Sequence, residues 1–233
     1  MNVAIIPARG GSKRIPRKNI RIFNGKPMIA HSIRSAQACG LFDRIIVTTD
    51  DDEIAAVARE WGAETPFKRP AQLADDHATT NAVIKHAVQW LRDNGCPVEF
   101  ACCIYATAPF IQPRFLREGY ERLKNSDRSY AFTVTTFPFP IQRAIRINDQ
   151  GTVDAFNPEH IFTRSQDLEE AFHDAGQFYW GTAEAFLKDY VIFSPVSIPI
   201  LLPRHLVQDI DTPEDWRRAE LMYRLLQQDG EVK

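Results

Sequence analysis

Short apolar runs alternate along the chain with longer segments of helical periodicity. The apolar runs are rich in β-branched and aromatic residues and predict strands at residues 3–7, 44–49, 100–109, 130–136, 177–181 and 196–203. The segments between them predict helices at residues 27–39, 52–61, 80–94, 113–126, 182–189 and 213–228. This alternation is typical of a Rossmann-like α/β fold, in which helices flank a mostly parallel sheet.

Glycine, acidic and hydroxyl residues mark the ends of several predicted helices. Gly40 and Gly62 each follow a helix at the position where a left-handed residue commonly ends it. Residues 50–52 are three aspartates before the second helix, where they either cap its N-terminus or bind a ligand. Thr79 or Thr80 caps the third helix on the simplest interpretation, and this role does not exclude contact with a ligand.

The regular alternation stops between residues 137 and 176. Two short strands are predicted there around the turn at residues 148–151, followed by polar, loop-rich chain. The segment carries more apolar side chains than a solvated loop needs, namely Phe137, Phe139, Ile141, Phe156, Ile161 and Phe162. Exposed apolar patches usually mark interfaces, so we expect residues 137–176 to form an inserted arm that contacts a second subunit.

Length and composition limit the class of protein. The 233 residues fit one domain, 1–233, and the net charge of −2 with 25% charged residues argues against a nucleic-acid-binding surface. No apolar run approaches the roughly 20 residues of a membrane span, and none resembles a signal peptide, so we expect a cytoplasmic protein without a membrane partner. Cys39, Cys96, Cys102 and Cys103 have no CxxC spacing, which favours free thiols.

The loop after the first strand concentrates positive charge. Its cations are Arg9, Lys13, Arg14, Arg17 and Lys18. Gly10 and Gly11 allow backbone conformations and close approaches that side chains would block, so the loop suits a polyanionic ligand. The spacing matches neither GxxxxGK[ST] nor GxGxxG, which argues against a nicotinamide oxidoreductase. A solvated basic loop without a ligand is the alternative.

Two carboxylates stand together near the C-terminus. Asp209 and Asp211 are separated by one residue, and in an extended segment this spacing places both side chains on the same face. Such a pair suits a hard cation. The alternative is structural, with both aspartates paired to arginines.

These motifs together resemble the CMP-sialic acid synthetase family of cytidylyltransferases. The matching pieces are residues 8–13 (ARGGSK), 16–19 (PRKN), 69–76 (RPAQLADD) and 207–216 (VQDIDTPEDW), and the likeness extends over nearly the whole chain. The resemblance implies a fold of the nucleotide-diphospho-sugar transferase type. It also implies transfer of CMP from CTP to a nonulosonic acid, a nine-carbon 2-keto sugar acid, with release of pyrophosphate.

The resemblance also implies roles for individual residues. The implied CTP-binding residues are Ala8, Arg9, Gly10, Gly11, Ser12, Lys18, Asn19, Arg69, Ala78 and Thr80. The implied catalytic residues are Arg9, Ser12, Lys18 and Asp211, with Mg²⁺ held by Asp209 and Asp211. No side chain is identified as a dedicated general base.

The acceptor site differs from the common family pattern at three positions. Tyr105 replaces a glutamine, Gln142 replaces a lysine and His173 replaces an arginine. These changes resemble the branch of the family that acts on pseudaminic acid; N-acetylneuraminic or legionaminic acid remains the alternative. The implied sugar-binding residues are Tyr105, Thr107, Gln142, Arg164, Gln166, His173, Gln177 and Tyr179. In this family the inserted arm exchanges between subunits, so we expect a homodimer in which Arg164, Gln166 or Asp167 approaches the partner's substrate site. A noncatalytic nucleotide-binding protein is the remaining alternative.

Overall fold

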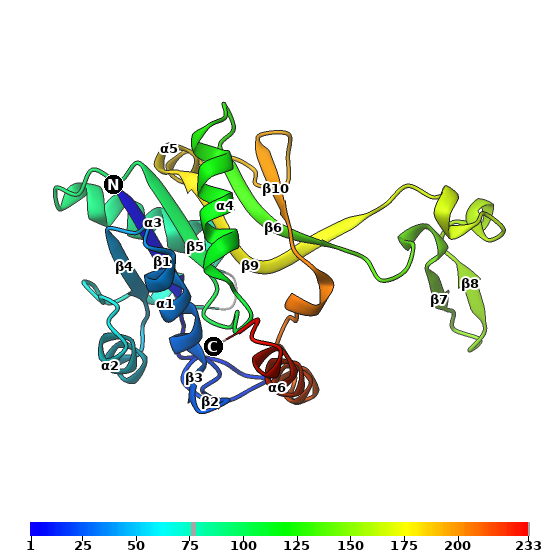
Figure 1. Ribbon diagram of the computed structural model, residues 1–233, viewed down its shortest axis with the longest axis horizontal. Helices are drawn as coiled ribbons and strands as arrows, with labels where there is room; N and C mark the ends of the chain where they lie inside the picture. Colours follow the sequence, from blue (N-terminus) through cyan, green and yellow to red (C-terminus); the bar gives the residue numbers. More distant parts are fainter. Residues whose placement is uncertain (76–77, 233) are drawn as a thin grey trace.

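The computed structural model describes residues 1–75 and 78–232 and has the predicted α/β architecture (Figure 1). The strands of its main sheet are β1 (Asn2–Pro7), β4 (Arg44–Thr48), β5 (Phe100–Ile104), β6 (Tyr130–Thr136), β9 (Phe172–Thr182) and β10 (Ser197–Leu201). They are ordered β10–β6–β9–β5–β1–β4. β9 is antiparallel to β5 and β6, and the other pairs are parallel. The expected mostly parallel sheet is therefore confirmed.

Helices cover both faces of this sheet. They are α1 (Met28–Cys39), α2 (Asp52–Glu60), α3 (Thr80–Asp93), α4 (Pro113–Lys124), α5 (Ala183–Leu187) and α6 (Pro213–Gln228). Successive residues of a strand point to opposite faces, so β1 contributes to two cores. Ala4 and Ile6 pack with α1, α2 and α4, whereas Val3 and Ile5 pack with α3 and α5. A third cluster joins α6 to the small hairpin of β2 (Ile22–Phe23) and β3 (Lys26–Pro27).

The helix ends follow the predicted chemistry. Gly40 and Gly62 are in the left-handed region, with φ of 71° and 87°. The side chain of Asp51 accepts hydrogen bonds from the backbone N–H groups of Glu53 and Ile54, both at 3.0 Å, so it caps α2. Thr79 caps α3 in the same manner. The capping interpretation is therefore confirmed for one of the three aspartates and for Thr79.

Two predicted strands have different bounds in the structure. The apolar run at residues 100–109 leaves the sheet after Ile104, and its second half forms the loop before α4. The strand predicted at residues 177–181 begins five residues earlier, at Phe172, because β9 continues along β6 toward the inserted segment. Both differences arise from pairing between distant strands, which a local pattern does not reveal.

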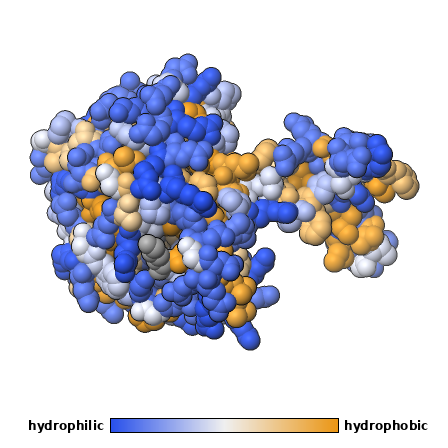
Figure 2. Space-filling model, viewed as in Figure 1, coloured by the Kyte–Doolittle hydropathy of each residue, from blue (hydrophilic) through white to orange (hydrophobic). Residues whose placement is uncertain are grey.

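The inserted segment projects from the body of the molecule as a long arm (Figure 1). Its hairpin consists of β7 (Ile145–Ile147) and β8 (Val153–Ala155), as the turn at residues 148–151 predicts. Apolar side chains gather on the arm (Figure 2). The exposed fraction reaches 79% for Phe139 and 96% for Phe162. The predicted exposure of this apolar set is confirmed.

Two further observations concern the described part of the chain. None of its helices is long and apolar enough to span a membrane. Cys39, Cys96, Cys102 and Cys103 are free thiols, as their spacing predicts. Burial raises the pKa of Cys39, Cys102 and Cys103, which keeps these thiols protonated at neutral pH.

Candidate active site

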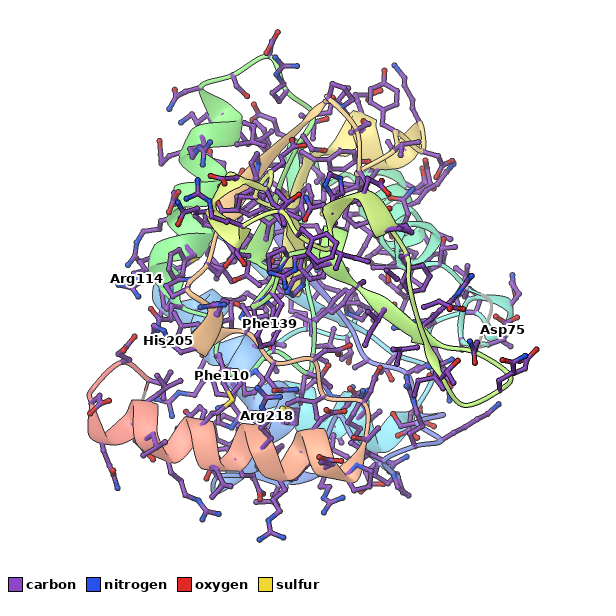
Figure 3. All side chains as sticks on the ribbon, turned by 90° about the vertical axis from the view of Figure 1, so that its right-hand side faces the viewer. Asp75, Phe110, Arg114, Phe139, His205 and Arg218 are labelled. Carbon is purple, nitrogen blue, oxygen red and sulfur yellow. The ribbon has the colours of Figure 1, made fainter. Side chains whose placement is uncertain are left out.

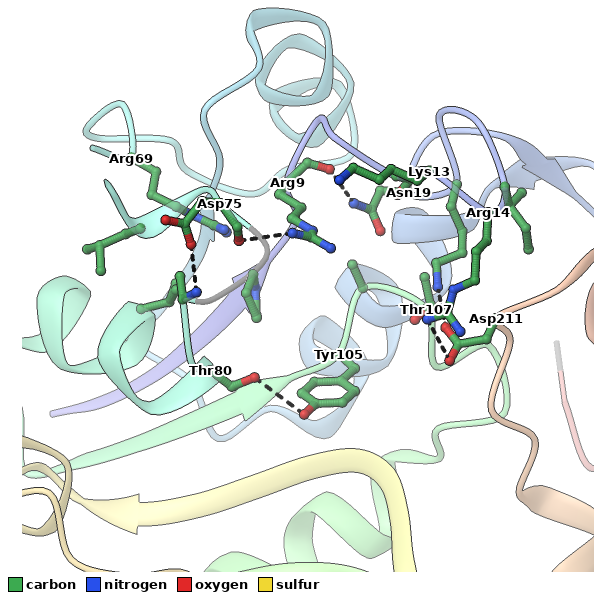
Figure 4. Close-up of a pocket in the computed structure, with 18 residues that line it drawn as sticks. Arg9, Lys13, Arg14, Asn19, Arg69, Asp75, Thr80, Tyr105, Thr107 and Asp211 are labelled. Carbon is green, nitrogen blue, oxygen red and sulfur yellow. Dashed lines mark hydrogen bonds and ion pairs between the residues drawn. The ribbon is translucent and has the colours of Figure 1, made fainter. Parts of the chain in front are cut away.

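A cavity of about 300 Å³ opens beside the carboxyl ends of β1 and β5 (Figure 4). Ligands of open α/β sheets bind at this edge, where loops from several strands meet. The predicted site residues that line the cavity are Arg9, Ser12, Lys18, Asn19, Arg69, Ala78, Thr80, Tyr105, Thr107 and Asp211. Segments far apart in the sequence are therefore brought together as expected. Ala8, Gly10 and Gly11 belong to the same loop but do not line the cavity.

The basic loop points most of its cations into this cavity. Arg9, Lys13, Arg14 and Lys18 line it. The buried amide of Asn19 donates to the carbonyl oxygen of Arg9 at 2.9 Å and so holds the two ends of the loop together. Four cations around one cavity, on a fixed loop, make a binding site for a polyanion.

Arg17 differs from the other four cations. It is in the left-handed region with a φ of 56° and forms an ion pair with Asp51 at 2.5 Å. This pair, together with the backbone N–H groups of α2, holds the pKa of Asp51 at about 2. Arg17 therefore fixes the loop to the N-terminus of α2 and does not line the cavity.

The two glycines of the loop have different surroundings. The N–H of Gly10 donates to Asp50 at 3.0 Å, and a Cβ atom at this position would lie 2.8 Å from a carboxylate oxygen of Asp51. Gly10 is thus required by close packing against α2. Neither Gly10 nor Gly11 is in the left-handed region, so the expected unusual backbone angle belongs to Arg17.

Arg69 anchors the second loop behind the cavity. Its guanidinium is buried and donates to the hydroxyl and carbonyl oxygens of Thr48. Burial lowers the pKa of Arg69 to about 10, so it stays charged at neutral pH. Asp75, which the sequence did not single out, accepts from Arg9 through its carbonyl at 2.9 Å and from the N–H of Ala78 through its carboxylate at 2.7 Å. These bonds tie the two loops together across the cavity.

Asp211 lies opposite these loops and is already paired with cations. Its carboxylate is 2.9 Å from Arg14 and 3.3 Å from Lys18. Lys18 also donates to the carbonyl of Ile210 at 2.7 Å. The structural alternative for Asp211, pairing with an arginine, is therefore present in the structure and does not remove the carboxylate from the cavity.

The segment carrying Asp211 is held from both sides. Thr212 and Asp215 form a capping box at the start of α6. The buried amide of Gln177 donates to the carbonyl of Leu206 at 2.5 Å. Partial burial raises the pKa of Asp209, with a smaller contribution from the charge of Asp211, but Asp209, unlike Asp211, does not line the cavity. Within residues 1–75 and 78–232, no cluster of three or more His, Cys, Asp or Glu forms a preassembled metal site.

A smaller cavity of about 170 Å³ adjoins the first and shares Thr80 and Tyr105 with it. Its other walls are mainly apolar, with Asn81, Asp174 and Tyr179 as polar groups. The hydroxyl of Tyr179 donates to Asp174, and the ring of Tyr179 lies 5.4 Å from that of Tyr105. Burial raises the pKa values of both tyrosines, so their hydroxyls remain protonated donors.

Five of the predicted sugar-binding residues lie outside both cavities. His173 packs against Phe137 with ring centroids 4.8 Å apart, and Gln177 is buried against Leu206 as described above. Gln142, Arg164 and Gln166 belong to the arm, where Gln142 donates to Glu169 and Arg164 pairs with Asp167. Gln177 therefore has a supporting position in this chain.

Comparison with known proteins agrees with this geometry. Residues 3–212 match the protein family described as "Cytidylyltransferase". This chain belongs to that family. The cytidylyltransferase is 46% identical over 224 residues to a pseudaminic acid cytidylyltransferase of Campylobacter jejuni, with 96% of this chain and 97% of the relative covered. The resemblance found in the sequence is therefore confirmed.

Other similar proteins share less sequence. CMP-N,N′-diacetyllegionaminic acid synthase of Legionella pneumophila is 31% identical, with 97% of each chain covered. N-acylneuraminate cytidylyltransferase of Escherichia coli is 28% identical, with 93% of this chain and 51% of the relative covered. A solved CMP:2-keto-3-deoxy-manno-octonic acid synthetase complexed with CTP superimposes with a TM-score of 0.69 at 16% identity, covering 96% of this cytidylyltransferase and 98% of that chain. The structural likeness supports the nucleotidyltransferase fold.

Proposed function

We propose that this cytidylyltransferase transfers CMP from CTP to the anomeric hydroxyl of pseudaminic acid, giving CMP-pseudaminate and pyrophosphate. The observation that carries the proposal is the 46% identity to a pseudaminic acid cytidylyltransferase along 96% of the chain. The legionaminic acid relative is 31% identical to this chain, and the N-acylneuraminate relatives are 27–31% identical. Those acceptors remain the second candidates for the same reaction.

The first cavity is the proposed CTP site. Arg9, Lys13, Arg14 and Lys18 provide positive charge for a triphosphate, and the second loop, with Arg69, Ala78 and Thr80, borders the cavity on its other side. Main-chain groups and short polar side chains at the start of α3 suit the recognition of a base or ribose. Gly10 and Gly11 allow the loop to approach the phosphates closely.

The proposed reaction is an in-line displacement at the α-phosphorus of CTP. The anomeric hydroxyl loses its proton to solvent and its oxygen forms a bond to this phosphorus. The bond to the oxygen that bridges to the β-phosphorus breaks, and pyrophosphate leaves with that oxygen. Arg9, Ser12 and Lys18 are proposed to stabilise the charge on the leaving group. Fixed cations stabilise such developing charge because they need not reorganise during the reaction.

The carboxylates of Asp209 and Asp211 fit a magnesium ion. Mg²⁺ is usually bound by one or two carboxylates together with substrate phosphates, and Asp211 lines the cavity proposed for the triphosphate. Burial and, to a smaller extent, the charge of Asp211 raise the pKa of Asp209, and a bound cation would favour the charged form of both carboxylates. When bound, the ion would withdraw electron density from the phosphate oxygens.

The smaller cavity is the proposed place for the acceptor's acyl groups. Its largely apolar walls suit methyl groups, and Tyr105, Tyr179 and Asp174 offer polar partners for amides and hydroxyls. Tyr105 and Thr107 also border the CTP site, so they would contact the sugar near the reacting hydroxyl. His173 is proposed to act from the N-terminal end of β9, where its ring packs edge-to-face against Phe137.

We also propose that the enzyme is a homodimer joined by the arm. The apolar side chains of the arm are exposed in a single chain, and such patches usually mark interfaces. In a symmetric dimer the same surface of a second copy would bury them. In this arrangement Gln142, Arg164 and Gln166 would act at the acceptor site of the partner subunit.

Pyrophosphate release from CTP tests the reaction class. The purified full chain is incubated with CTP and pseudaminic acid, with and without Mg²⁺, and pyrophosphate is measured together with CMP-sugar by mass spectrometry. Release that requires both the acceptor and Mg²⁺ would support the proposal. A chain that binds CTP but forms no CMP-sugar with any nonulosonic acid would instead be a noncatalytic binding protein.

A further inference from the structure

A second cavity, of about 370 Å³, lies between α1, α4 and the segment that follows α6. It shares no lining residue with the proposed CTP site. In Figure 3, Arg114 of the second cavity lies on the opposite side of the view from Asp75 of the first. The two cavities are therefore separate places on the molecule.

Positive charge dominates the rim of this second cavity. Lys26, Arg34, Arg114 and Arg117 line it, and Glu231 carries the one carboxylate among the lining residues that the structure describes. That carboxylate lies 3.3 Å from His205. The cavity thus holds more positive than negative charge, which favours an anionic ligand.

The three arginines have no carboxylate partner within the described chain. Arg117 donates to the carbonyls of Ala38 and Cys39 at 3.3 and 3.1 Å, and the guanidinium of Arg114 lies 4.7 Å from the ring centroid of Phe115. Guanidinium groups bind phosphate through paired N–H donors. Arginines without a carboxylate partner are therefore suited to bind a phosphate group.

Two buried side chains in the cavity wall offer hydrogen-bond acceptors. His31 and Gln112 are only 5% and 8% exposed. His31 donates from Nε2 to the carbonyl of Phe23 at 3.0 Å, and burial lowers its pKa to about 4, so Nδ1 of the neutral ring is an acceptor. Gln112 donates from Nε2 to the carbonyl of Glu231 at 3.1 Å. Neither His31 Nδ1 nor Gln112 Oε1 receives a hydrogen bond from a described residue, so both can accept from a ligand.

We infer that this cavity binds a phosphate ester of a hydroxyl-bearing small molecule, such as a nucleotide. Arg34, Arg114 and Arg117 hold the phosphate, and His31 and Gln112 accept hydrogen bonds from the hydroxyl or N–H groups of the ligand. The volume is within the range of small-molecule sites in proteins.

Isothermal titration calorimetry at low salt, with CMP as the probe, tests this inference. The double variant Arg34→Ala and Arg114→Ala removes two exposed cations from the rim, and Arg217→Ala removes an exposed arginine of α6 outside the cavity as a matched control. Because each lost charge-assisted bond weakens binding by roughly tenfold or more, we expect the double variant to lose a CMP-binding event or weaken it at least about 100-fold. The control should bind as the wild type does.

Two results would overturn the inference. A CMP isotherm for the double variant that matches the wild type would show that the rim binds no nucleotide. Inorganic phosphate that binds the same site as tightly as CMP would show that the hydroxyl-bearing part contributes nothing. Both titrations are independent of CTP turnover, since Arg34 and Arg114 lie outside the proposed active site.

Discussion

Lys18 has a central position among the charged residues of the first cavity. It contacts both Asp211 and the carbonyl of Ile210, so its ammonium group is fixed between the basic loop and the segment before α6. A cation held in this way is preorganised for charge that develops on the leaving pyrophosphate. Its removal should therefore affect the reaction more than the fold.

Lys18→Ala is predicted to lower kcat by about 100-fold or more, in line with the loss of one preorganised stabilising group. Steady-state pyrophosphate release measures the effect, and Lys188→Ala, at an exposed lysine paired with Glu184, is the control. An unchanged kcat would mean that the basic loop is only a solvated surface.

Asp211→Asn tests the proposed metal ligand. The substitution keeps the size of the side chain but removes its charge, and Asp211 is partly exposed, so the melting temperature should change little. We predict a fall in kcat of about 100-fold or more, because the charge is needed mainly in the transition state. Asp229→Asn, at the exposed end of α6, should retain full activity. Wild-type turnover of the Asp211 variant would place the metal elsewhere.

The residues expected at CTP gather around one cavity, whereas most of those expected at the acceptor do not. Arg9, Lys18 and Asp211 belong to charged motifs whose chemistry is visible locally, Arg69 was indicated by the family resemblance, and all four line the cavity. Gln177 was expected at the sugar, but its amide is used inside the protein to hold Leu206. Which way a strand residue faces depends on its neighbours in the sheet, and that information is not local.

At the scale of elements, the contact between the basic loop and α2 stabilises both of these elements. Asp51 caps α2 and also pairs with Arg17, which occupies a left-handed conformation. The aspartate thus stabilises a helix and the loop conformation together. Its folded-state pKa of about 2 is below the ordinary value of 3.8, so its stabilising contribution is complete above about pH 4 and is lost as the pH falls toward 2.

Asp51→Ala is predicted to lower the free energy of unfolding by about 2 kcal/mol, of which about half comes from the cap and half from the partly exposed ion pair. Asp51→Asn should lose less, because an asparagine still caps the helix. Urea unfolding at pH 7 measures both values, and Asp52→Ala, at an exposed neighbour, is the control. Equal losses for Asp51→Ala and Asp52→Ala would contradict the proposed double role.

The elements themselves were largely predictable, and their exact ends were not. Apolar runs and caps identified the strands of the main sheet and the helices that cover it. β9 was predicted too short because residues 172–174 pair with β6, a contact between strands that are about 40 residues apart. The run at residues 100–109 was predicted too long, because the buried Ala106 and Ala108 of the loop continue the apolar pattern beyond Ile104, the last residue of the strand.

At the scale of the whole molecule, the arm is the feature that an isolated chain does not explain. Its hairpin of β7 and β8 pairs only with itself in the described chain, and it exposes several large apolar side chains. Both the apolar excess and the hairpin were visible in the sequence. Their position away from the body became clear only with the fold.

The arm is predicted to hold two chains together in solution. Sedimentation of the wild type should give a dimer, and Phe139→Asp with Phe162→Asp should give a monomer, since charges in an apolar interface are costly to bury. Because arm residues are proposed to act on the partner subunit, the monomer should also be less active. Leu225→Asp, at an exposed apolar residue of α6, is the control. A fully active wild-type monomer would contradict both parts of this prediction.

Acceptor choice is the most direct test of the proposed function. The ratio of kcat/KM for pseudaminic acid to that for N-acetylneuraminic acid is measured with CTP and Mg²⁺ in excess. A site that leaves buried polar groups without partners can reject the wrong sugar by up to about 10⁴-fold, and we predict a ratio of at least about 100 in favour of pseudaminic acid. Comparable values for the two sugars, or a preference for N-acetylneuraminic acid, would contradict the assignment.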